Sequence, residues 1–385
     1  MKDVLTVNKT SIARAAFAFL CVTLALGPLI ACNGTSSNGS TSLATAKPGP
    51  TPRFLYAASC AGSSNGGINE YGVDAASGAL APLSGSPFLA GLDCPNFMTV
   101  NPEQTFLFVP DDEEEQIHVY AIASNGALSE IPRSPYSQCA FQLAVDPSGR
   151  FLVAPNFCDN SVGVYSIGSD GTLSAVAGSP FRGATTAQPV GVLIDPRGQR
   201  VFVANEGTSS NVSVFTMSSN GVLSEVPGSP FAAGDSTYAL SETPDGKYLF
   251  ANDFSSGGQI LVYAVSGSTG SLTLLTKPAY PGGPCWDSID EKGVILFSTD
   301  CEGNLSISII SSDGTLTPAA GSPAAIGTSL FAVIGDPSGA FVYTADSGNP
   351  GSLFAYRYSV DGALTPISGS PLTARGDFFG LVVTY

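Results

Sequence analysis

The sequence predicts an all-β fold, because two turn motifs recur down the chain with one shared period. The first motif is Gly-Ser-Pro-Phe or a variant of it, and its seven prolines stand at positions 87, 135, 180, 230, 278, 323 and 371. The second is a turn glycine, found at positions 78, 126, 171, 221, 270, 314 and 362. Successive prolines are 45 to 50 residues apart. Seven units of this length, each with room for about four strands, predict a seven-bladed β-propeller.

The stretch Val145–Phe181 illustrates one unit. A turn at 146–149 (Asp-Pro-Ser-Gly) precedes two short β-branched and aromatic runs, Phe151–Ala154 and Val162–Ile167, which indicate strands. A second turn, Ser-Asp-Gly, leads into a third run at Leu173–Val176, and Gly-Ser-Pro-Phe ends it. The unit therefore contains an inner turn, an outer turn and a strand-stopping motif.

The two ends of the repeat complement each other. The first unit starts at Phe54–Tyr56 with no inner strand before it, and the last apolar run, Gly380–Tyr385, has no second strand after it. Inner strands are expected to end near Val100, Val145, Ile194, Ser241, Ile289, Ile334 and Val383. We expect the C-terminal strand to pair with the N-terminal blade, which closes the ring and removes an open edge.

Residues 1–32 indicate an export signal rather than part of the fold. Basic residues (Lys2, Lys9 and Arg14) precede the apolar stretch Ala15–Ile30. The stretch leads into Leu-Ile-Ala-Cys, which resembles the bacterial lipobox, and this resemblance implies cleavage before Cys32 and lipid attachment to its thiol. An ordinary signal peptide or an anchor helix are the alternatives.

Residues 33–52 are rich in Ser, Thr, Gly and Pro, so they are expected to form a flexible tether. Residues 53–385 then form the propeller. With this organisation, the protein is expected to be exported and lipid-anchored in the bacterial cell envelope, on the periplasmic or outer-membrane face.

The charge balance narrows the partners. The chain has 31 acidic and 15 basic residues, a net charge of −16, and its basic residues form no cluster. Phosphate recognition requires converging basic side chains, so no nucleic acid is expected as a partner. We expect a monomer that contacts the membrane only through its lipid anchor, needs no cofactor, and binds an unknown small molecule or envelope protein.

Six cysteines lie beyond the signal and the lipobox, and the repeat restricts their 15 possible pairings. Two pairs flank equivalent inner hairpins of different units, and the third occupies similar loop positions. The expected disulfides are Cys139–Cys158, Cys285–Cys301 and, by elimination, Cys60–Cys94. They would share one face, near the mouth of the central channel. A thiolate metal cluster and free core thiols are the alternatives, but Cys-x-x-Cys is absent and an exported chain favours disulfides.

Candidate functional residues lie in the variable loops of that face, because binding is usually placed in loops on a rigid scaffold. Arg182 and Arg375 follow Ser-Pro motifs, and together with Glu206 they could bind a carboxylate or a lactone carbonyl. Glu206 would be the general base. Salt bridges between neighbouring loops are the simpler interpretation of all three.

The remaining candidate residues differ in their interpretation. Trp286, the only tryptophan, could stack on a sugar ring or plug the channel, and Asp253 and Asp377 could contact a ligand. The acidic run 111–115 (Asp-Asp-Glu-Glu-Glu) could hold a hard cation such as Ca²⁺, but it lacks the usual ligand spacing, and a solvated loop is simpler. His118 lies in a predicted third strand and is interpreted as structural.

The repeats resemble a known family. The runs 202–205 (Phe-Val-Ala-Asn) and 211–215 (Asn-Val-Ser-Val-Phe), preceded by 195–198 (Asp-Pro-Arg-Gly), look like the YVTN-type repeat. With the Gly-x-Leu and Gly-Ser-Pro-Phe elements they resemble the seven-bladed lactonase family, which includes 6-phosphogluconolactonase and muconate cycloisomerase-like proteins. The resemblance covers residues 53–385 and implies a site of His, Arg and Glu around the channel. The one histidine, His118, is not placed to take that role.

These observations lead to two main hypotheses of function. The first is an exported, lipid-anchored propeller that binds a ligand or a protein partner at its disulfide-bearing face. The alternative is a lactone hydrolase acting on a sugar or related lactone outside the cytoplasm, with Glu206, Arg182 and Arg375 as catalytic residues. A structural scaffold of the envelope, with a sealed channel and no pocket, is a third possibility.

Overall fold

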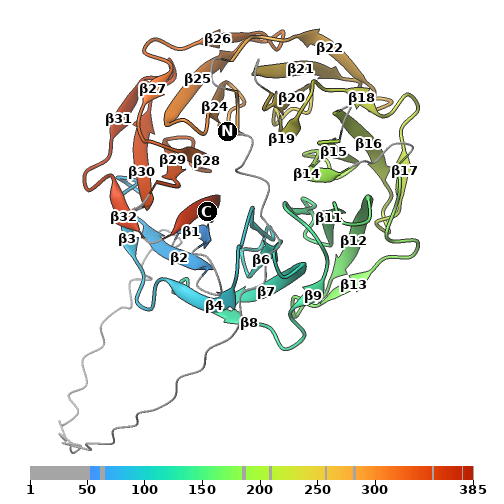
Figure 1. The fold of residues 1–385 in the computed structure, drawn as a ribbon, viewed down its shortest axis with the longest axis horizontal. Helices are drawn as coiled ribbons and strands as arrows, with labels where there is room; N and C mark the ends of the chain where they lie inside the picture. The colour runs from blue at the N-terminus through green and yellow to red at the C-terminus, as the bar shows by residue number, and fades with distance from the viewer. Residues whose placement is uncertain are drawn as a thin grey trace, which may run out of the picture. The chain divides into compact units, whose positions relative to one another are not determined.

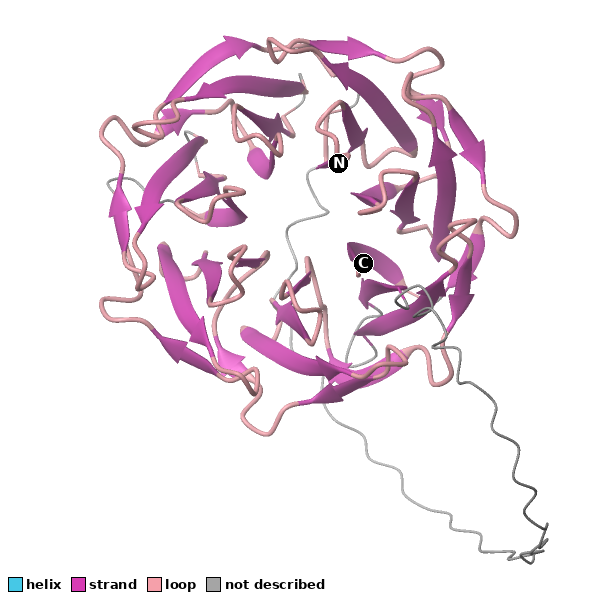
Figure 2. Cartoon of the chain, turned by 180° about the vertical axis from the view of Figure 1, so that it is seen from behind, coloured by secondary structure: helices cyan, strands magenta, loops and turns pink. Residues whose placement is uncertain are grey.

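Seven antiparallel sheets form a ring in the computed structural model, and strands are its regular elements (Figures 1 and 2). The structure describes residues 53–60, 66–183, 188–207, 210–255, 258–280, 283–348, 351–374 and 376–384. In these segments there is no helix with the length and apolar character needed to cross a membrane. The predicted seven-bladed β-propeller is confirmed. The predicted signal, the lipid-attachment residue Cys32 and the tether all lie outside the described residues.

Each blade runs from its inner strand outward, and any short additional strand comes last. Blade 1 is β33 (Asp377–Val383), β1 (Arg53–Cys60), β2 (Gly66–Val73), β3 (Leu80–Pro82) and β4 (Phe88–Leu92). Blade 2 is β5 (Thr99–Val100), β6 (Phe106–Asp111), β7 (Gln116–Ile122), β8 (Leu128–Glu130) and β9 (Tyr136–Ser137). Blade 3 is β10 (Ala144–Val145), β11 (Phe151–Asn156), β12 (Ser161–Ile167) and β13 (Leu173–Ala175).

The remaining blades follow the same order. Blade 4 is β14 (Pro189–Ile194), β15 (Arg200–Asn205), β16 (Asn211–Met217), β17 (Leu223–Glu225) and β18 (Phe231–Ala232). Blade 5 is β19 (Thr237–Glu242), β20 (Tyr248–Asp253), β21 (Gln259–Val265) and β22 (Leu272–Thr276). Blade 6 is β23 (Trp286–Ile289), β24 (Ile295–Thr299), β25 (Asn304–Ile310), β26 (Leu316–Pro318) and β27 (Ala324–Ala325). Blade 7 is β28 (Leu330–Gly335), β29 (Phe341–Asp346), β30 (Gly351–Tyr358), β31 (Leu364–Pro366) and β32 (Leu372–Ala374).

The turn between the inner and second strands is built by its aspartate. In blade 3, Asp146 accepts hydrogen bonds from the backbone N–H groups of Arg150 and Phe151, at 2.7 and 2.6 Å. Gly149 adopts φ of 70°, a left-handed conformation that suits glycine. Blades 4 and 6 repeat the arrangement with Asp195 and Asp290. The turn motif therefore fixes where the second strand starts.

The serine of the Ser-Pro motif ends the outer strand in six blades, where its hydroxyl accepts a hydrogen bond from a backbone N–H of the third strand. The pairs, at 2.8 to 3.0 Å, are Ser86 with Glu70, Ser134 with Val119, Ser179 with Val164, Ser229 with Val214, Ser322 with Ile307 and Ser370 with Ala355. The Ser–Pro peptide bond is cis in the same six blades. Blade 5 differs, because Lys277 stands before its proline.

The apolar core is divided among the blade interfaces. Seven clusters of buried apolar side chains each join one blade to the next. The cluster between blades 5 and 6 is the smallest, built from Phe250, Ile260, Val262, Tyr280, Leu296 and Ile310. Each blade is thus stabilised by burial against both of its neighbours.

Pairing of the two chain ends closes the ring. Strand β33 pairs antiparallel with β1, Leu55 opposite Val383, and lies beside it in Figure 1. The Thr384 hydroxyl accepts the Phe54 N–H at 2.7 Å, and a buried ion pair of 2.8 Å joins Arg53 to Asp336 of blade 7. Residues 48–385 form one compact unit. Because this unit contains every core cluster and its own ring closure, the propeller is a self-contained folding unit.

A buried carboxyl group at the interface of blades 5 and 6 couples stability to pH. Asp287 of β23 accepts the Ser241 hydroxyl at 2.9 Å, while its other oxygen, Oδ1, has no hydrogen-bond partner among the described residues. Burial raises the pKa of Asp287 to about 7. The folded state therefore keeps a proton that the unfolded chain releases near pH 4, so folding stability falls as pH rises from about 4 to about 7.

Asp287→Asn should remove this dependence, since the amide can still accept from Ser241 and carries no charge. The variant should gain stability over the wild type at pH 8, by on the order of a few kcal/mol, since each pKa unit is worth about 1.4 kcal/mol. Urea unfolding between about pH 5 and about pH 8 measures the effect. Asp313→Asn, on an exposed turn, is the control. Equal pH slopes for the wild type and Asp287→Asn would contradict the assignment.

Candidate functional site

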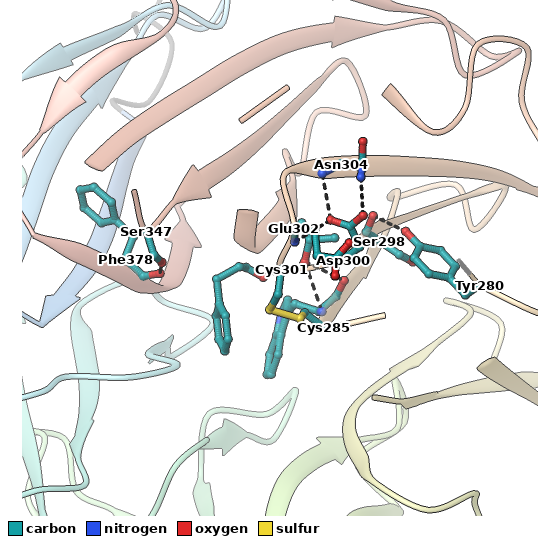
Figure 3. Close-up of a disulfide and its surroundings, with 12 residues drawn as sticks. Tyr280, Cys285, Ser298, Asp300, Cys301, Glu302, Asn304, Ser347 and Phe378 are labelled. Carbon is teal, nitrogen blue, oxygen red and sulfur yellow. Dashed lines mark hydrogen bonds between the residues drawn. A yellow bond between two sulfur atoms is a disulfide. The ribbon is translucent and has the colours of Figure 1, made fainter. Parts of the chain in front are cut away.

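Three disulfides mark one face of the propeller. They join Cys60 to Cys94, Cys139 to Cys158 and Cys285 to Cys301. Each links a loop that enters an inner strand to the end of a second strand or the loop after it. These are the pairs expected from the repeat. Figure 3 shows the Cys285–Cys301 disulfide beside Asp300, whose carboxylate accepts the backbone N–H groups of Glu302 and Asn304, both at 2.9 Å.

Carboxylates at the ends of second strands order the loops of this face. Asp253 is buried and accepts the backbone N–H groups of Asp235 and Ser236 at 3.2 and 3.0 Å. Asp111 and Asp346 hold the corresponding loops of their blades in the same way. Asp253, a candidate ligand contact from the sequence, is therefore engaged in positioning its own loop.

Six aromatic rings from six blades meet at the channel on the disulfide side. They are Phe97, Phe141, Tyr238, Trp286, Phe331 and Phe379, and we call them the aromatic floor. Phe97 of blade 2 stacks on Trp286 of blade 6, with ring centroids 3.3 Å apart and planes at 8°. The other contacts join ring centroids at 5.1 to 5.9 Å. Aromatic side chains from blades on opposite sides of the propeller thus meet and close the channel.

Local backbone irregularities direct several of these rings. Tyr238, Phe331 and Phe379 lie where the inner strands β19, β28 and β33 shift register against their neighbours. A β-bulge of this kind changes the direction of a side chain at a strand end. Blade 4 has its register shift at Val190, which is not aromatic. The floor is therefore interrupted at blade 4.

Of the floor residues, only Trp286 was predicted from the sequence as a candidate at the channel. A signal was present, because the six aromatic positions are separated by 44, 97, 48, 45 and 48 residues, where 97 spans two units. They repeat with the period of the turn motifs. Aromatic residues in a short apolar strand resemble ordinary core positions, however, and a propeller has many of those.

Two acidic side chains, from blades 4 and 2, have raised pKa values and act on a ring of the floor. Glu206 follows β15 of blade 4, where its N–H donates to the Gln188 carbonyl at 3.0 Å and its carboxylate lies 3.4 Å from the Ser236 hydroxyl. Burial raises the pKa of Glu206. Asp112 accepts the Asn96 amide at 2.6 Å, and its pKa is raised to about 6, chiefly by burial and then by Glu113 and Asp111.

Tyr238 connects these carboxylates to the floor. Its pKa is raised chiefly by burial, and the negative charges of Glu206 and Asp112 add to the effect. The two carboxylates therefore both act on the phenol, and the backbone of Glu206 bonds to Gln188, two residues before Val190 at the break in the floor.

Of the two predicted arginines, the structure describes Arg182. Arg182 is exposed, forms a 3.4 Å ion pair with Asp159, and donates to the backbone carbonyls of Asp159 and Asn160. It is thus held by the loop after β11 of its own blade. Arg375 lies outside the described residues, so convergence of Arg182, Glu206 and Arg375 stays a prediction. Asp377 begins β33, and partial burial raises its pKa.

The acidic run has mixed roles. Asp111 and Asp112 are engaged as described above, and the Glu115 carboxylate lies within 4.8 Å of the sulfurs of Cys139 and Cys158. Because those sulfurs form a disulfide, they are not thiolate ligands. Cation binding by this run stays a prediction. His118 pairs with Glu130 at 2.8 Å between outer strands, a structural arrangement.

The fold and its closed channel define a seven-bladed β-propeller with a loop-built face. The family model described as "Lactonase, 7-bladed beta-propeller" matches residues 54–181 and 137–237. The chain belongs to this seven-bladed lactonase family. A comparison with curated proteins found no match.

Solved structures share the fold. A proposed 6-phosphogluconolactonase from Bacteroides uniformis ATCC 8492 has 17% identity and a TM-score of 0.73, covering 87% of this chain and 100% of that one. The corresponding Bacteroides fragilis NCTC 9343 protein has 18% identity and a TM-score of 0.73, covering 87% and 98%. The Pseudomonas aeruginosa periplasmic gluconolactonase PpgL has 20% identity and a TM-score of 0.71, covering 87% and 99%. At these identities the likeness establishes the architecture alone.

Removing the central ring of the floor should loosen the propeller. Phe97 is buried and contacts three other floor rings, so Phe97→Ala should cost about 3–5 kcal/mol of stability. Trp286 is the only tryptophan, and its emission should shift to longer wavelength as water reaches it. Urea unfolding and fluorescence spectra measure both effects. Phe254→Ala, at a partly exposed loop position, is the matched control, and an unchanged Trp286 spectrum in Phe97→Ala would argue against the stacked floor.

Proposed function

We propose that this protein is an exported, lipid-anchored propeller that binds a ligand on its disulfide-bearing face. The aromatic floor is the observation that carries the proposal. Phe141, Trp286, Phe331 and Phe379 are only partly buried, so they offer apolar ring surface to a molecule resting on the floor. A hollow of about 350 Å³ lies elsewhere, at the seam of blades 7 and 1 against Arg357. A closed channel favours binding at its mouth.

The charges around the floor favour a neutral or cationic ligand. The negative charges of Glu206 and Asp112 both act on Tyr238, whereas the cation Arg182 is held by Asp159. A sugar or lactone could lay its apolar face on the rings and donate hydroxyl groups to the carboxylates. A cationic ligand would be attracted both by the faces of the aromatic rings and by the carboxylates. A phosphorylated or carboxylated ligand would meet repulsion.

Export and anchoring rest on separate support. Three disulfides suit an oxidising compartment, and the similar Pseudomonas aeruginosa protein is described as periplasmic. Lipid attachment at Cys32 rests on the lipobox resemblance. A protein partner on the same face, the other form of the binding hypothesis, would use the same rings as anchors.

A ligand panel tests the charge preference. Titration of neutral sugars and lactones, such as glucono-1,5-lactone, should change Trp286 fluorescence, and 6-phosphogluconate should bind at least tenfold more weakly because of charge repulsion. Asp313→Asn, at a turn on the opposite face, should leave the affinities unchanged. Tighter binding of the phosphorylated compound would contradict the proposed ligand class. A lack of response to every small molecule would leave a protein partner as the ligand.

Lactone hydrolysis is the second candidate function, and Glu206 favours it. A half-buried carboxylate with a raised pKa can take a proton from water as the water attacks a lactone carbonyl. Ring opening would then give the hydroxy acid, with the proton returned to the leaving alkoxide. The neighbouring Ser236 hydroxyl would help to orient the carboxylate.

Hydrolysis is testable with a pH-stat and a lactone panel that includes 6-phosphogluconolactone. Turnover should rise as Glu206 loses its proton, at a pH above the usual glutamate range, and should fall by about 10²-fold or more in Glu206→Gln. Turnover of Arg182→Gln, measured in the same way, tests separately whether the predicted arginine takes part in hydrolysis. Turnover that survives Glu206→Gln would remove Glu206 as the base, and no turnover on any lactone would leave ligand binding alone.

A further inference from the structure

The outer edge of blade 5 departs from the pattern of the other blades. In six blades the outer strand has three residues, and most of these strands end in Pro or Glu: β3, β8, β13, β17, β26 and β31. In blade 5 the outer strand β22 has five residues, Leu-Thr-Leu-Leu-Thr. Charges, prolines and short length are the usual means of blocking an exposed strand edge. Strand β22 has none of these three, and its one irregularity is a register shift near its end.

The missing serine accounts for the longer strand. Ser229 of blade 4 accepts the N–H of Val214, and the equivalent residues in blade 5 are Lys277 and Val262. Because Lys277 has no hydroxyl, the outer strand continues, and Thr276 pairs with Val262 instead. A register shift at this point leaves Leu274 and Leu275 both turned outward, with 41% and 43% of their surface exposed.

We propose that β22 is a self-association edge, at which two copies of this chain pair their β22 strands antiparallel about a two-fold axis. The open backbone edge supplies N–H and C=O groups for a new ladder. An axis near Leu274 would place the two Leu274 side chains together, with each Leu275 opposite a threonine of the second copy. The strand is therefore close to self-complementary, as a two-fold interface requires.

Charge supports a second copy as the occupant. The chain carries a net charge of −16, so two copies repel at long range. Residues 266–276, from the turn before β22 to its end, contain no charged side chain, and the next residue is the cation Lys277. Two copies can therefore meet at this edge without opposing like charges across the strands. A basic peptide, the other partner that an acidic chain would attract, would find no acidic side chain within this segment.

The size of the edge sets the strength of the association. Five residues bury far less than the roughly 1,200 Å² of a stable interface, so the dimer should be weak and concentration-dependent. This proposal revises the monomer expected from the sequence.

Sedimentation velocity of residues 48–385 tests the proposal, since these residues form a self-contained folding unit. The sedimentation coefficient should rise between about 10 µM and about 1 mM protein. The association should strengthen from about 20 mM to about 300 mM salt, because salt screens repulsion between two acidic copies. Leu274→Lys should reduce the association constant at least tenfold at unchanged melting temperature. Thr317→Lys, on the exposed outer strand of blade 6, is the matched control and should associate normally.

A crosslink locates the contact. Leu274→Cys should form a disulfide-linked dimer under mild oxidation at 0.1 mM or more, and Thr317→Cys should not. A protein that stays monomeric at every concentration, or a Leu274→Lys variant that associates as the wild type does, would overturn the proposal. Association that weakens with salt, or monomers that bind lipid vesicles through Leu274, would assign the edge to a different occupant and overturn it as well.

Discussion

The rest of this structure depends on the requirement that every strand edge be paired or stopped. A sheet presents open N–H and C=O groups at both edges, and a ring of seven sheets has seven inner and seven outer edges to manage. The chain ends are joined by the pairing of β33 with β1. On the outside, one serine hydroxyl per blade takes the place of the next strand residue as hydrogen-bond acceptor in six of the seven blades. A single side-chain hydrogen bond thus determines how long each outer strand is.

Closing the ring also determines what happens at its centre. Seven inner strands converge on one axis, and the space between them is filled by side chains or left as a channel. In this propeller, register shifts on three inner strands accompany the aromatic residues Tyr238, Phe331 and Phe379, and the rings of Phe97 in blade 2 and Trp286 in blade 6 stack. Only blade 4 contributes a smaller side chain, Val190, and Glu206 follows the second strand of that same blade. The half-buried acid Glu206 therefore lies near the gap in the floor at blade 4.

The sequence was most informative where the structure is periodic. Turn motifs, inner-strand positions and cysteine pairs depend on local backbone chemistry that recurs in each unit, so the fold and all three disulfides could be predicted. Side-chain partners in the loops recur less: Asp111, Asp253 and Asp346 share one arrangement in three of the blades, whereas Arg182 has its own. Nothing in the sequence indicates that Asp253 faces the N–H groups of its own loop, or that Arg182 bonds to carbonyls two strands earlier. The aromatic floor does recur, but its residue types are also those of a strand core, so periodicity alone could not distinguish lining the channel from packing between blades.

Departures from the repeat are then the places to look for function, because a repeat needs only one solution to each structural problem. Stability alone would be served by seven copies of the best blade. Instead the disulfides occur at three sites, the floor is broken at Val190, and the serine is replaced by Lys277. Two of these changes have a physical cost, since the break in the floor removes ring contacts and the loss of the serine exposes two leucines at an open strand edge. Each cost occurs at one blade and is avoided at the other six, which is the pattern that the proposed ligand-binding face and self-association edge would produce.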